Sequence, residues 1–203
     1  MQASYRSLYP AHLDLMQQRW QRAMESEGFE AILVHSGTPI VSFLDDYEYA
    51  FRPNPHFLQW LPLTHHPDCA LLIAPGRRPR LFYYQPDDYW YLPPRDPESW
   101  WADHFDIEVV RDAAGWQQRI GSHLDEGALE RTAALGDAPS LGSVFADERI
   151  NPEALLVRLH VERTRKTAYE IACMAEANRL AARAHAAAEQ AFREGGSEYE
   201  MTQ

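Results

Sequence analysis

The sequence predicts an α/β fold, a mixed sheet flanked by helices, and three observations support this fold class. A helical pattern leads directly into a short apolar run, 31–37, which indicates a buried strand. Two strand-like runs, 69–74 and 80–85, are separated by the turn sequence PGRRP and predict a hairpin. Two further strand candidates, 106–112 and 131–137, lie on either side of another helical pattern. Because strands both alternate with helices and pair in a hairpin, the sheet should be mixed.

Two helices are predicted within the first 150 residues. The first should begin at Pro10, since proline has no N–H to lose there, and should end at Gly28. Its apolar residues recur at helical spacing on one face: Leu13, Met16, Trp20 and Met24. A second amphipathic pattern follows the strand candidate at 106–112 and carries Trp116, Ile120 and Leu124.

The segment 42–63, SFLDDYEYAFRPNPHFLQWLPL, fits neither a strand nor a simple turn. Its prolines and the acidic pair Asp45–Asp46 exclude a core strand, and a turn would not need so many aromatic rings. We therefore interpret this aromatic segment as a surface that contacts something outside the chain.

The pattern changes at residue 151, where long helices are predicted. Asn151 can cap a helix that begins at Pro152. Thr167 and Glu170 then have the spacing of a capping box, so a second, alanine-rich helix should begin after Thr167 and end at Gly195. The stripe along this helix, which includes His185, should pack against a large partner.

Composition limits the classes of partner. A net charge of −11 argues against a nucleic-acid or anionic-membrane surface, because neither polyanion would be attracted. The two cysteines, Cys69 and Cys173, lack metal or redox spacing and suit a reducing compartment. No secretion signal is evident, and no apolar run approaches the roughly 20 residues of a membrane span. We expect a cytoplasmic protein with no nucleic-acid or membrane partner.

Two patterns could suggest metal chemistry within the chain. The run HHPDC, His65 to Cys69, has ligand-type side chains, but adjacent residues rarely converge on one ion without a second segment. We interpret it as a polar loop. The pair Asp45–Asp46 could belong to a two-metal nuclease, but neighbouring carboxylates do not supply the separated ligands that two ions need. We therefore predict no metal site in this chain.

Seven short motifs occur along the chain. They are HSG at 35, FLDD at 43, NPHF at 54, W-x-P at 60, PDDYW at 86, KTAYEIACM at 166 and GGSEYE at 195. Together they resemble the bacterial Xaa-Pro dipeptidases, or prolidases, and the related organophosphorus acid anhydrolases. One departure is Ala175, where these enzymes usually carry arginine.

The resemblance implies a domain organisation. Residues 1–152 would form a creatinase-like, ribonuclease-H-like N-terminal domain. Residues 153–203 would form a linker and the leading helices of a pita-bread catalytic domain. The catalytic residues and the ligands of two divalent metals, typically manganese, would lie beyond residue 203, so this chain alone should be inactive.

The resemblance also implies a function for the full-length protein. It would be a homodimeric, metal-dependent peptidase that hydrolyses dipeptides ending in proline, with a possible side activity on organophosphate esters. By the same resemblance Asp46 would meet the substrate's N-terminal end in the partner subunit, and Trp90 would form a wall of the substrate pocket. The residues alone leave other interpretations open: Asp45 and Asp46 as a turn device, Trp90 as partly core, and the chain as a non-catalytic dimerisation module.

Overall fold

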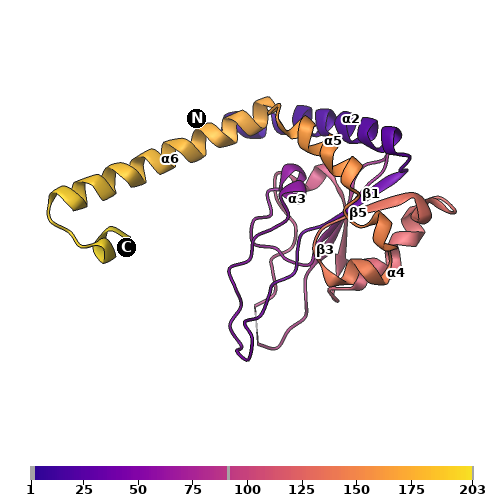
Figure 1. The fold of residues 1–203 in the computed structure, drawn as a ribbon, viewed down its shortest axis with the longest axis horizontal. Coiled ribbons are helices and arrows are strands. Elements are labelled where there is room, and N and C mark those ends of the chain that lie inside the picture. The colour runs from indigo at the N-terminus through magenta and orange to yellow at the C-terminus, as the bar shows by residue number, and fades with distance from the viewer. Residues whose placement is uncertain (1–2, 91, 203) are drawn as a thin grey trace. The chain divides into compact units, whose positions relative to one another are not determined.

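The computed structural model describes residues 3–90 and 92–202 (Figure 1). They form two compact units. One unit contains Leu13–Thr164, and the other combines the N-terminal residues up to His12 with the chain from Arg165 onward.

The unit Leu13–Thr164 is an α/β domain. Its helices and strands follow in this order, with α2 beginning in the other unit: α2 (Tyr9–Glu27), β1 (Ala31–His35), α3 (Pro55–Trp60), β2 (Ala70–Ile73), β3 (Arg80–Tyr84), β4 (Asp106–Val110), α4 (Gly115–Arg119), β5 (Thr132–Leu135) and α5 (Glu153–Arg163). Short 3-10 helices lie at Ala102–His104, Ile120–His123, Ala128–Arg131, Pro139–Ser143 and Asp147–Arg149.

The five strands form one sheet in the order β4-β3-β2-β1-β5. Strand β2 is antiparallel to both β1 and β3, whereas β3 pairs with β4 and β1 pairs with β5 in parallel. Four strands therefore run in one direction and β2 runs against them. The predicted mixed sheet and the predicted hairpin are confirmed.

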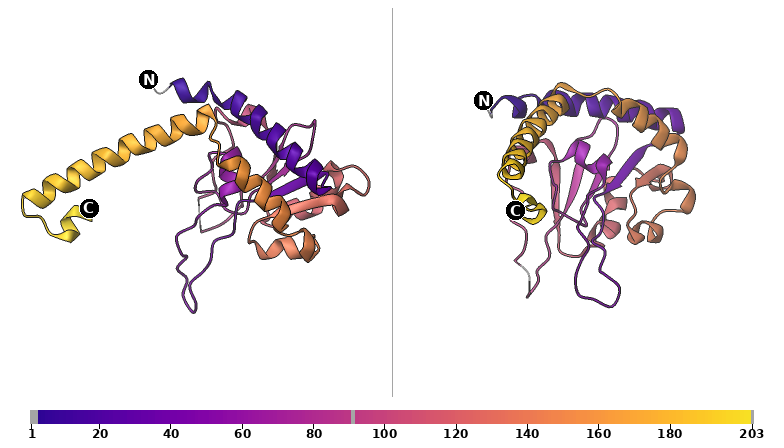
Figure 2. Two further views of the ribbon diagram at one scale, coloured as in Figure 1. Left: turned by 45° about the horizontal axis from the view of Figure 1, so that its top comes forward. Right: turned by 60° about the vertical axis from the view of Figure 1, so that its left-hand side comes forward.

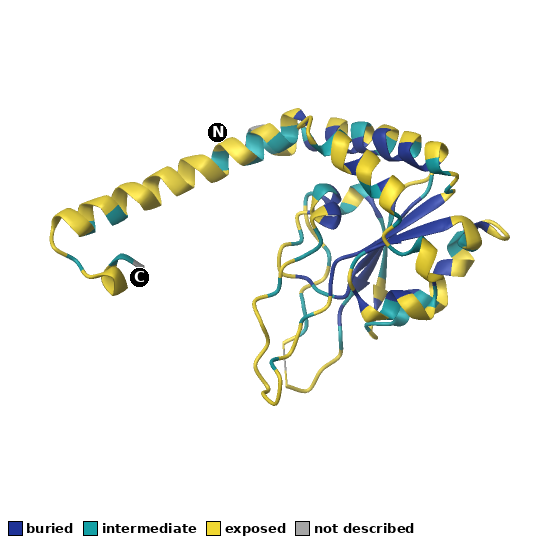
Figure 3. Cartoon of the chain, viewed as in Figure 1, coloured by how far each residue is buried: buried dark blue, intermediate teal, exposed yellow. Residues whose placement is uncertain are grey.

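Both faces of the sheet are buried (Figure 3). Helix α4 and the 3-10 turns cover one face, and α2, α3 and α5 cover the other (Figure 1). The first face packs Ala31, Leu33, Ala70, Leu72, Phe82 and Ala134 against Trp116, Ile120, Leu141 and Phe145. Such two-sided burial explains why the strands are continuous apolar runs and do not alternate apolar with polar residues.

Helix α2 forms as predicted. Its expected face, Leu13, Met16, Trp20 and Met24, is buried. Gly28 ends the helix with a φ of 75°, a left-handed conformation that glycine adopts at little cost. The Trp20 ring meets the Trp60 ring of α3 edge-on, with 5.4 Å between centroids, which joins the two helices in one apolar layer.

Helix α3 was not predicted, and it divides the aromatic segment. The Asn54 side chain caps it by accepting the His56 N–H at 2.9 Å, and Pro55 occupies the first turn. Phe57 and Trp60 are fully buried. The second half of this segment is therefore core, which corrects the interpretation of the whole segment as a contact surface.

Two other local predictions need correction. Asn151 does not cap α5: its side chain accepts the Gly136 N–H at 2.9 Å and donates to the Gly136 carbonyl at 2.6 Å. This pair of bonds holds the end of β5, so the amide is unavailable to the helix. The predicted helix through Leu124 is shorter, because α4 ends at Arg119 and a 3-10 turn follows.

The second unit contains α1 (Ala3–Arg6), α6 (Ala168–Arg193) and α7 (Glu198–Thr202). The capping box is confirmed: the Thr167 hydroxyl accepts the Glu170 N–H at 3.2 Å, and the Glu170 carboxylate accepts the Thr167 N–H at 2.7 Å. The same hydroxyl lies 2.8 Å from Nδ1 of His12. The Tyr9 and Tyr169 rings pack 5.1 Å apart, so the N-terminal residues fix the start of α6.

Helix α6 buries none of its residues (Figure 3). His185 is exposed, and the described residues offer the alanine-rich face no covering surface, so its packing against a large partner stays a prediction. Ile171 and Phe192 on this helix are also exposed. Among the described residues, no helix combines the length and the apolar character that crossing a membrane requires.

We predict that Leu159→Ala destabilises the α/β unit by about 2–5 kcal/mol, because the side chain is 1% exposed and its removal leaves a cavity. Val157→Ala on the same helix is the matched control: Val157 is 54% exposed, and its truncation should change the unfolding free energy by less than about 0.5 kcal/mol. Urea unfolding followed by tryptophan fluorescence measures both. Equal effects would contradict the packing of α5 described here.

Candidate functional site

The segments that follow β1 and β3 leave the sheet at the same end, which we call the carboxyl edge of the sheet. These strands run in the same direction, so their carboxyl ends lie at the same edge. The segment 36–54 follows β1, and the segment 85–105 follows β3. Both extend as long loops from this end of the sheet in every view (Figures 1 and 2). In open α/β sheets the carboxyl edge is where ligand sites usually form.

The first loop contains a preformed two-stranded arm, which we define as residues 40–49. The Ser42 N–H donates to the Tyr47 carbonyl at 2.8 Å, and the Tyr49 N–H donates to the Ile40 carbonyl at 2.9 Å. An antiparallel bridge between the strands of the arm completes this ladder. The arm is thus ordered by its own backbone bonds.

The tip of the arm is a tight turn with an unusual leucine. The Asp45 N–H closes the turn by donating to the Ser42 carbonyl at 3.1 Å. Leu44 sits in the left-handed region with a φ of 58°, which costs a non-glycine residue about 1–2 kcal/mol. Its side chain is also 91% exposed, so neither backbone conformation nor burial favours leucine here. Strain of this kind is concentrated at functional sites.

The two aspartates of the tip differ in their contacts. The Asp45 carboxylate accepts the backbone N–H of Asp46 at 2.8 Å. The Asp46 carboxylate is exposed and has no hydrogen bond or ion pair within residues 3–90 and 92–202. Asp45 therefore acts on the local backbone, whereas the charge of Asp46 is available to a ligand.

The second loop presents Trp90. Its indole is 83% exposed, so the interpretation of Trp90 as partly core is wrong; the loop carries it beyond the sheet edge. Its backbone N–H donates to the Asp88 carboxylate at 2.6 Å. Its ring meets the Tyr89 ring edge-on, with centroids 5.0 Å apart. Trp90 is thus held locally and turned to solvent.

Each of the two loops exposes several large apolar side chains at the same end of the sheet. They lie on the arm and on the second loop: Ile40, Val41, Phe43, Leu44, Tyr47, Tyr49, Tyr89, Trp90 and Leu92. Large apolar side chains that are exposed in such numbers commonly belong to an interaction site.

The run HHPDC forms a structural loop at the same edge. His66 Nε2 lies 2.7 Å from the Tyr84 carbonyl, and the Cys69 thiol accepts the Tyr84 N–H at 3.3 Å. The Asp68 carboxylate accepts the Thr38 hydroxyl at 2.6 Å. These side chains serve local bonds and do not fit a metal. Across the described part of the chain, no three His, Cys, Asp or Glu residues are grouped as metal ligands.

His35 anchors the start of the first loop. Its Nδ1 accepts the Gly37 N–H at 3.1 Å, and Gly37 has a φ of 105°, a conformation that suits glycine. Burial lowers the pKa of His35 to about 4, although the Asp137 carboxylate partly opposes this shift. The imidazole is therefore neutral at pH 7, and its role is to hold the turn after β1.

Two cavities in the α/β unit are large enough to hold a small ligand. One, of about 470 Å³, lies at the end of β5, and Arg52, Asn54 and Asn151 are among the residues that line it. Asn54 donates to the Leu135 carbonyl at 3.2 Å, and Asn151 bonds to Gly136, so the two amides hold the strand ends. Neither Asp46 nor Trp90 lines this cavity.

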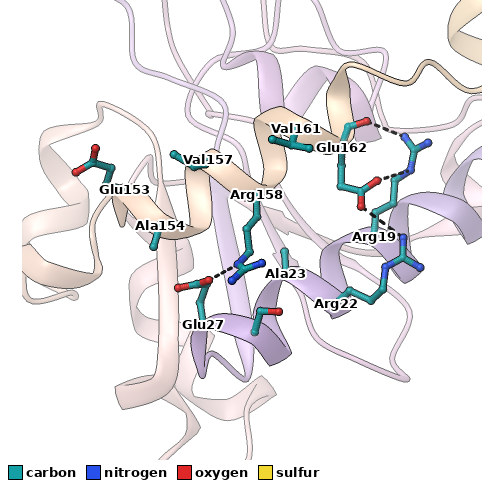
Figure 4. A pocket seen from close by; sticks show the side chains of 11 residues that line it. Arg19, Arg22, Ala23, Glu27, Glu153, Ala154, Val157, Arg158, Val161 and Glu162 are labelled. Atoms are coloured by element: carbon teal, nitrogen blue, oxygen red, sulfur yellow. Dashed lines mark hydrogen bonds and ion pairs between the residues drawn. The ribbon is translucent and has the colours of Figure 1, made fainter.

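A second cavity, of about 930 Å³, lies between α2 and α5 (Figure 4). Five of its charged side chains pair with one another: Arg19 and Arg22 with Glu162, and Arg158 with Glu27. The cavity contains neither Asp46 nor Trp90. We interpret it as a groove between packed helices, because most of its charges are satisfied within the chain.

Comparison with known proteins decides the family. Residues 7–161 match the family described as Xaa-Pro dipeptidase, N-terminal domain. The chain belongs to this family. The resemblance identified in the motifs is therefore confirmed, and the chain is an N-terminal portion of a prolidase-type protein.

Curated relatives agree with this assignment. Xaa-Pro dipeptidases from Pectobacterium carotovorum and Xanthomonas axonopodis are 40% and 39% identical over 198 residues, covering 96% and 98% of this chain. The protein of the same name from Aeromonas hydrophila is 37% identical over 199 residues. The chain spans 43–44% of the length of these relatives.

Solved structures confirm the fold class. Aminopeptidase P from Escherichia coli, in its low-pH form, aligns with a TM-score of 0.59 at 19% identity, covering 97% of this chain and 47% of that one. A Pseudomonas aeruginosa aminopeptidase aligns with a TM-score of 0.52 at 16% identity, covering 95% and 50%. These alignments show that the chain shares its α/β fold with the aligned portions of both aminopeptidases.

The depressed pKa of His35 gives a pH prediction. Between the ordinary value of 6.5 and about 4, the unfolded chain binds a proton that folded His35 does not, so stability is lost as pH falls through this window. His35→Gln should therefore flatten the pH dependence of the unfolding free energy between pH 7 and pH 4. Identical slopes in the natural protein and in the variant, measured by urea unfolding, would contradict the burial argument.

Proposed function

We propose that this chain is the N-terminal part of a metal-dependent Xaa-Pro dipeptidase, in which it forms part of the dimer contact and of the substrate pocket. One observation carries the proposal: a single sheet edge presents an unengaged carboxylate, Asp46, and an exposed indole, Trp90, on loops with exposed apolar side chains. Family membership supplies the reaction class.

Asp46 is suited to the charged end of the substrate. A dipeptide carries a free ammonium group, and a fixed carboxylate pairs with it through a charge-assisted hydrogen bond. Such a pair gains strength when surrounding water is removed. The apolar side chains next to Asp46 on the arm would exclude water once a second subunit covers them. We therefore assign Asp46 to binding of the substrate's N-terminal end, in the partner's site.

Trp90 is suited to limit substrate length. Its large, locally held ring can form a wall beyond the proline residue, which leaves room for two residues but not for a third. In a pocket closed by shape, a longer peptide is rejected because it clashes with the wall. This assigns Trp90 to selectivity and not to the chemical step.

The exposed apolar side chains of the two loops support a homodimer. Closed two-fold dimers are the commonest oligomers, and such an interface buries the same patch of both subunits. A non-catalytic dimerisation module would use the same surface, so dimerisation alone does not separate the two functions; dipeptide hydrolysis does.

The metals belong, in this proposal, to the remainder of the full-length protein. Two divalent ions, typically manganese, would activate the water that attacks the scissile carbonyl. The residues from 153 onward would lead into that catalytic domain. A side activity on organophosphate esters is part of the same proposal, and so is a cytoplasmic location, which the unpaired Cys69 and Cys173 favour.

Asp46→Ala should weaken substrate binding in the full-length, manganese-loaded protein. Loss of a hydrogen bond to a charged group costs about 1.5–3 kcal/mol, so the KM for glycyl-proline should rise about ten- to hundredfold. Asp147→Ala removes an exposed carboxylate elsewhere in the domain and should leave KM unchanged. The 203-residue chain alone should show no hydrolysis. A natural full-length protein that does not cleave glycyl-proline would contradict the proposal.

Phe43→Ser and Leu44→Ser should weaken the dimer. Burial of each large apolar side chain contributes about 1.5–3 kcal/mol, and a symmetric contact buries each twice, so the dimer dissociation constant should rise by about two orders of magnitude or more. Val157→Ser, on the exposed face of α5, should not change it. Sedimentation equilibrium of the full-length protein gives the constants. A dimer that is insensitive to both arm variants would exclude the arm from the interface.

A further inference from the structure

The same contact occurs in both loops that carry a proposed substrate residue. In the arm, the Asp45 carboxylate accepts the backbone N–H of Asp46 at 2.8 Å. In the second loop, the Asp88 carboxylate accepts the backbone N–H of Trp90 at 2.6 Å. Each proposed substrate residue therefore has its own backbone held by an aspartate next to it or two residues before it.

The contact in the arm restricts the orientation of Asp46. The Asp45 backbone N–H closes the turn onto the Ser42 carbonyl, and the Asp45 side chain holds the following N–H. Leu44 holds a left-handed conformation that leucine rarely adopts, so this turn has a tendency to relax to another geometry. The bond from Asp45 opposes this relaxation at the peptide group that leads into Asp46.

The contact in the second loop restricts the orientation of Trp90. The bond between Asp88 and the Trp90 N–H spans two residues, the spacing at which an aspartate side chain mimics a backbone turn. The Tyr89 ring packs edge-on against the indole. Because the indole is otherwise exposed, these two contacts determine its direction before a substrate arrives.

We propose that Asp45 and Asp88 are positioning residues of the dipeptidase site: Asp45 orients the Asp46 carboxylate, and Asp88 orients the Trp90 ring. The inference rests on the proposed function. It follows from preorganisation, since a loop that is already ordered loses less conformational entropy when substrate binds. Both residues act through an acceptor oxygen on a backbone N–H, so their negative charge is not the essential property.

That distinction determines the variants. Asn keeps a side-chain oxygen that can accept the same N–H, whereas Ala removes it. Asp45→Ala and Asp88→Ala should therefore impair the site, and Asp45→Asn and Asp88→Asn should restore it. A residue that binds the substrate ammonium directly by its charge would not be rescued by Asn.

A third aspartate provides a matched control. The Asp112 carboxylate accepts the Ala114 N–H at 2.9 Å, which is the same spacing as in the second loop. Asp112 follows β4, whose carboxyl end lies at the same sheet edge as that of β3. No proposed substrate residue is next to it. Asp112→Ala thus removes an equal contact and tests whether any such loss affects the site.

The experiment uses the manganese-loaded full-length protein with glycyl-proline and glycyl-prolyl-alanine. Asp45→Ala should raise the KM for glycyl-proline about five- to tenfold with kcat within about twofold, since it removes positioning and not chemistry. Asp88→Ala should raise the ratio of tripeptide to dipeptide cleavage about fivefold, since it loosens the wall. Asp45→Asn should return the KM, and Asp88→Asn the cleavage ratio, to within about twofold of the natural protein. Asp112→Ala should match the natural protein in both the KM and the ratio.

Three results would overturn the inference. Alanine variants that match Asp112→Ala would show that the two contacts are ordinary turn bonds. Asn variants as impaired as the Ala variants would show that the charge itself acts. A natural protein that leaves glycyl-proline intact would contradict the proposed function and this inference together, whereas the first two results would contradict only the inference.

Discussion

The parallel direction of β1 and β3 is the constraint on which the candidate site depends. These strands are not neighbours, because β2 lies between them and runs the opposite way. Their carboxyl ends nevertheless lie at one edge, so loops far apart in the chain emerge together (Figure 2). If β3 ran in the direction opposite to β1, Asp46 and Trp90 would leave opposite ends of the sheet.

The rest of the domain supports this edge. Helices cover both sheet faces, so the strands are rigid and the loops at their ends start from fixed points. Helix α3 adds a second anchor, because Trp60 packs on Trp20 and fixes the chain where the first loop returns to the core. The arm between these anchors then needs only its own ladder to stand out from the surface.

Local signals made much of the fold predictable from the sequence. The capping box at Thr167, the apolar face of α2 and the hairpin turn each depend on residues close in the chain. Asn151 could not be predicted, since its bonds to Gly136 come from distant sequence and compete with the cap. The exposure of Trp90 could not be predicted either, because a tryptophan gives the same sequence signal whether a loop turns it inward or outward. Motifs indicated Asp46 and Trp90, but the contact of Asp88 with the Trp90 N–H depends on the fold of the loop and carries no sequence signal.

The burial of Cys69 has a practical consequence for chemical probes. Its thiol is fully enclosed, and burial raises its pKa to about 12, so it stays protonated and unreactive at neutral pH. The other cysteine, Cys173, lies on α6 and is partly accessible. A maleimide dye or spin label would therefore attach to α6 and leave the sheet unmarked, which gives a reporter for whatever comes to cover that helix.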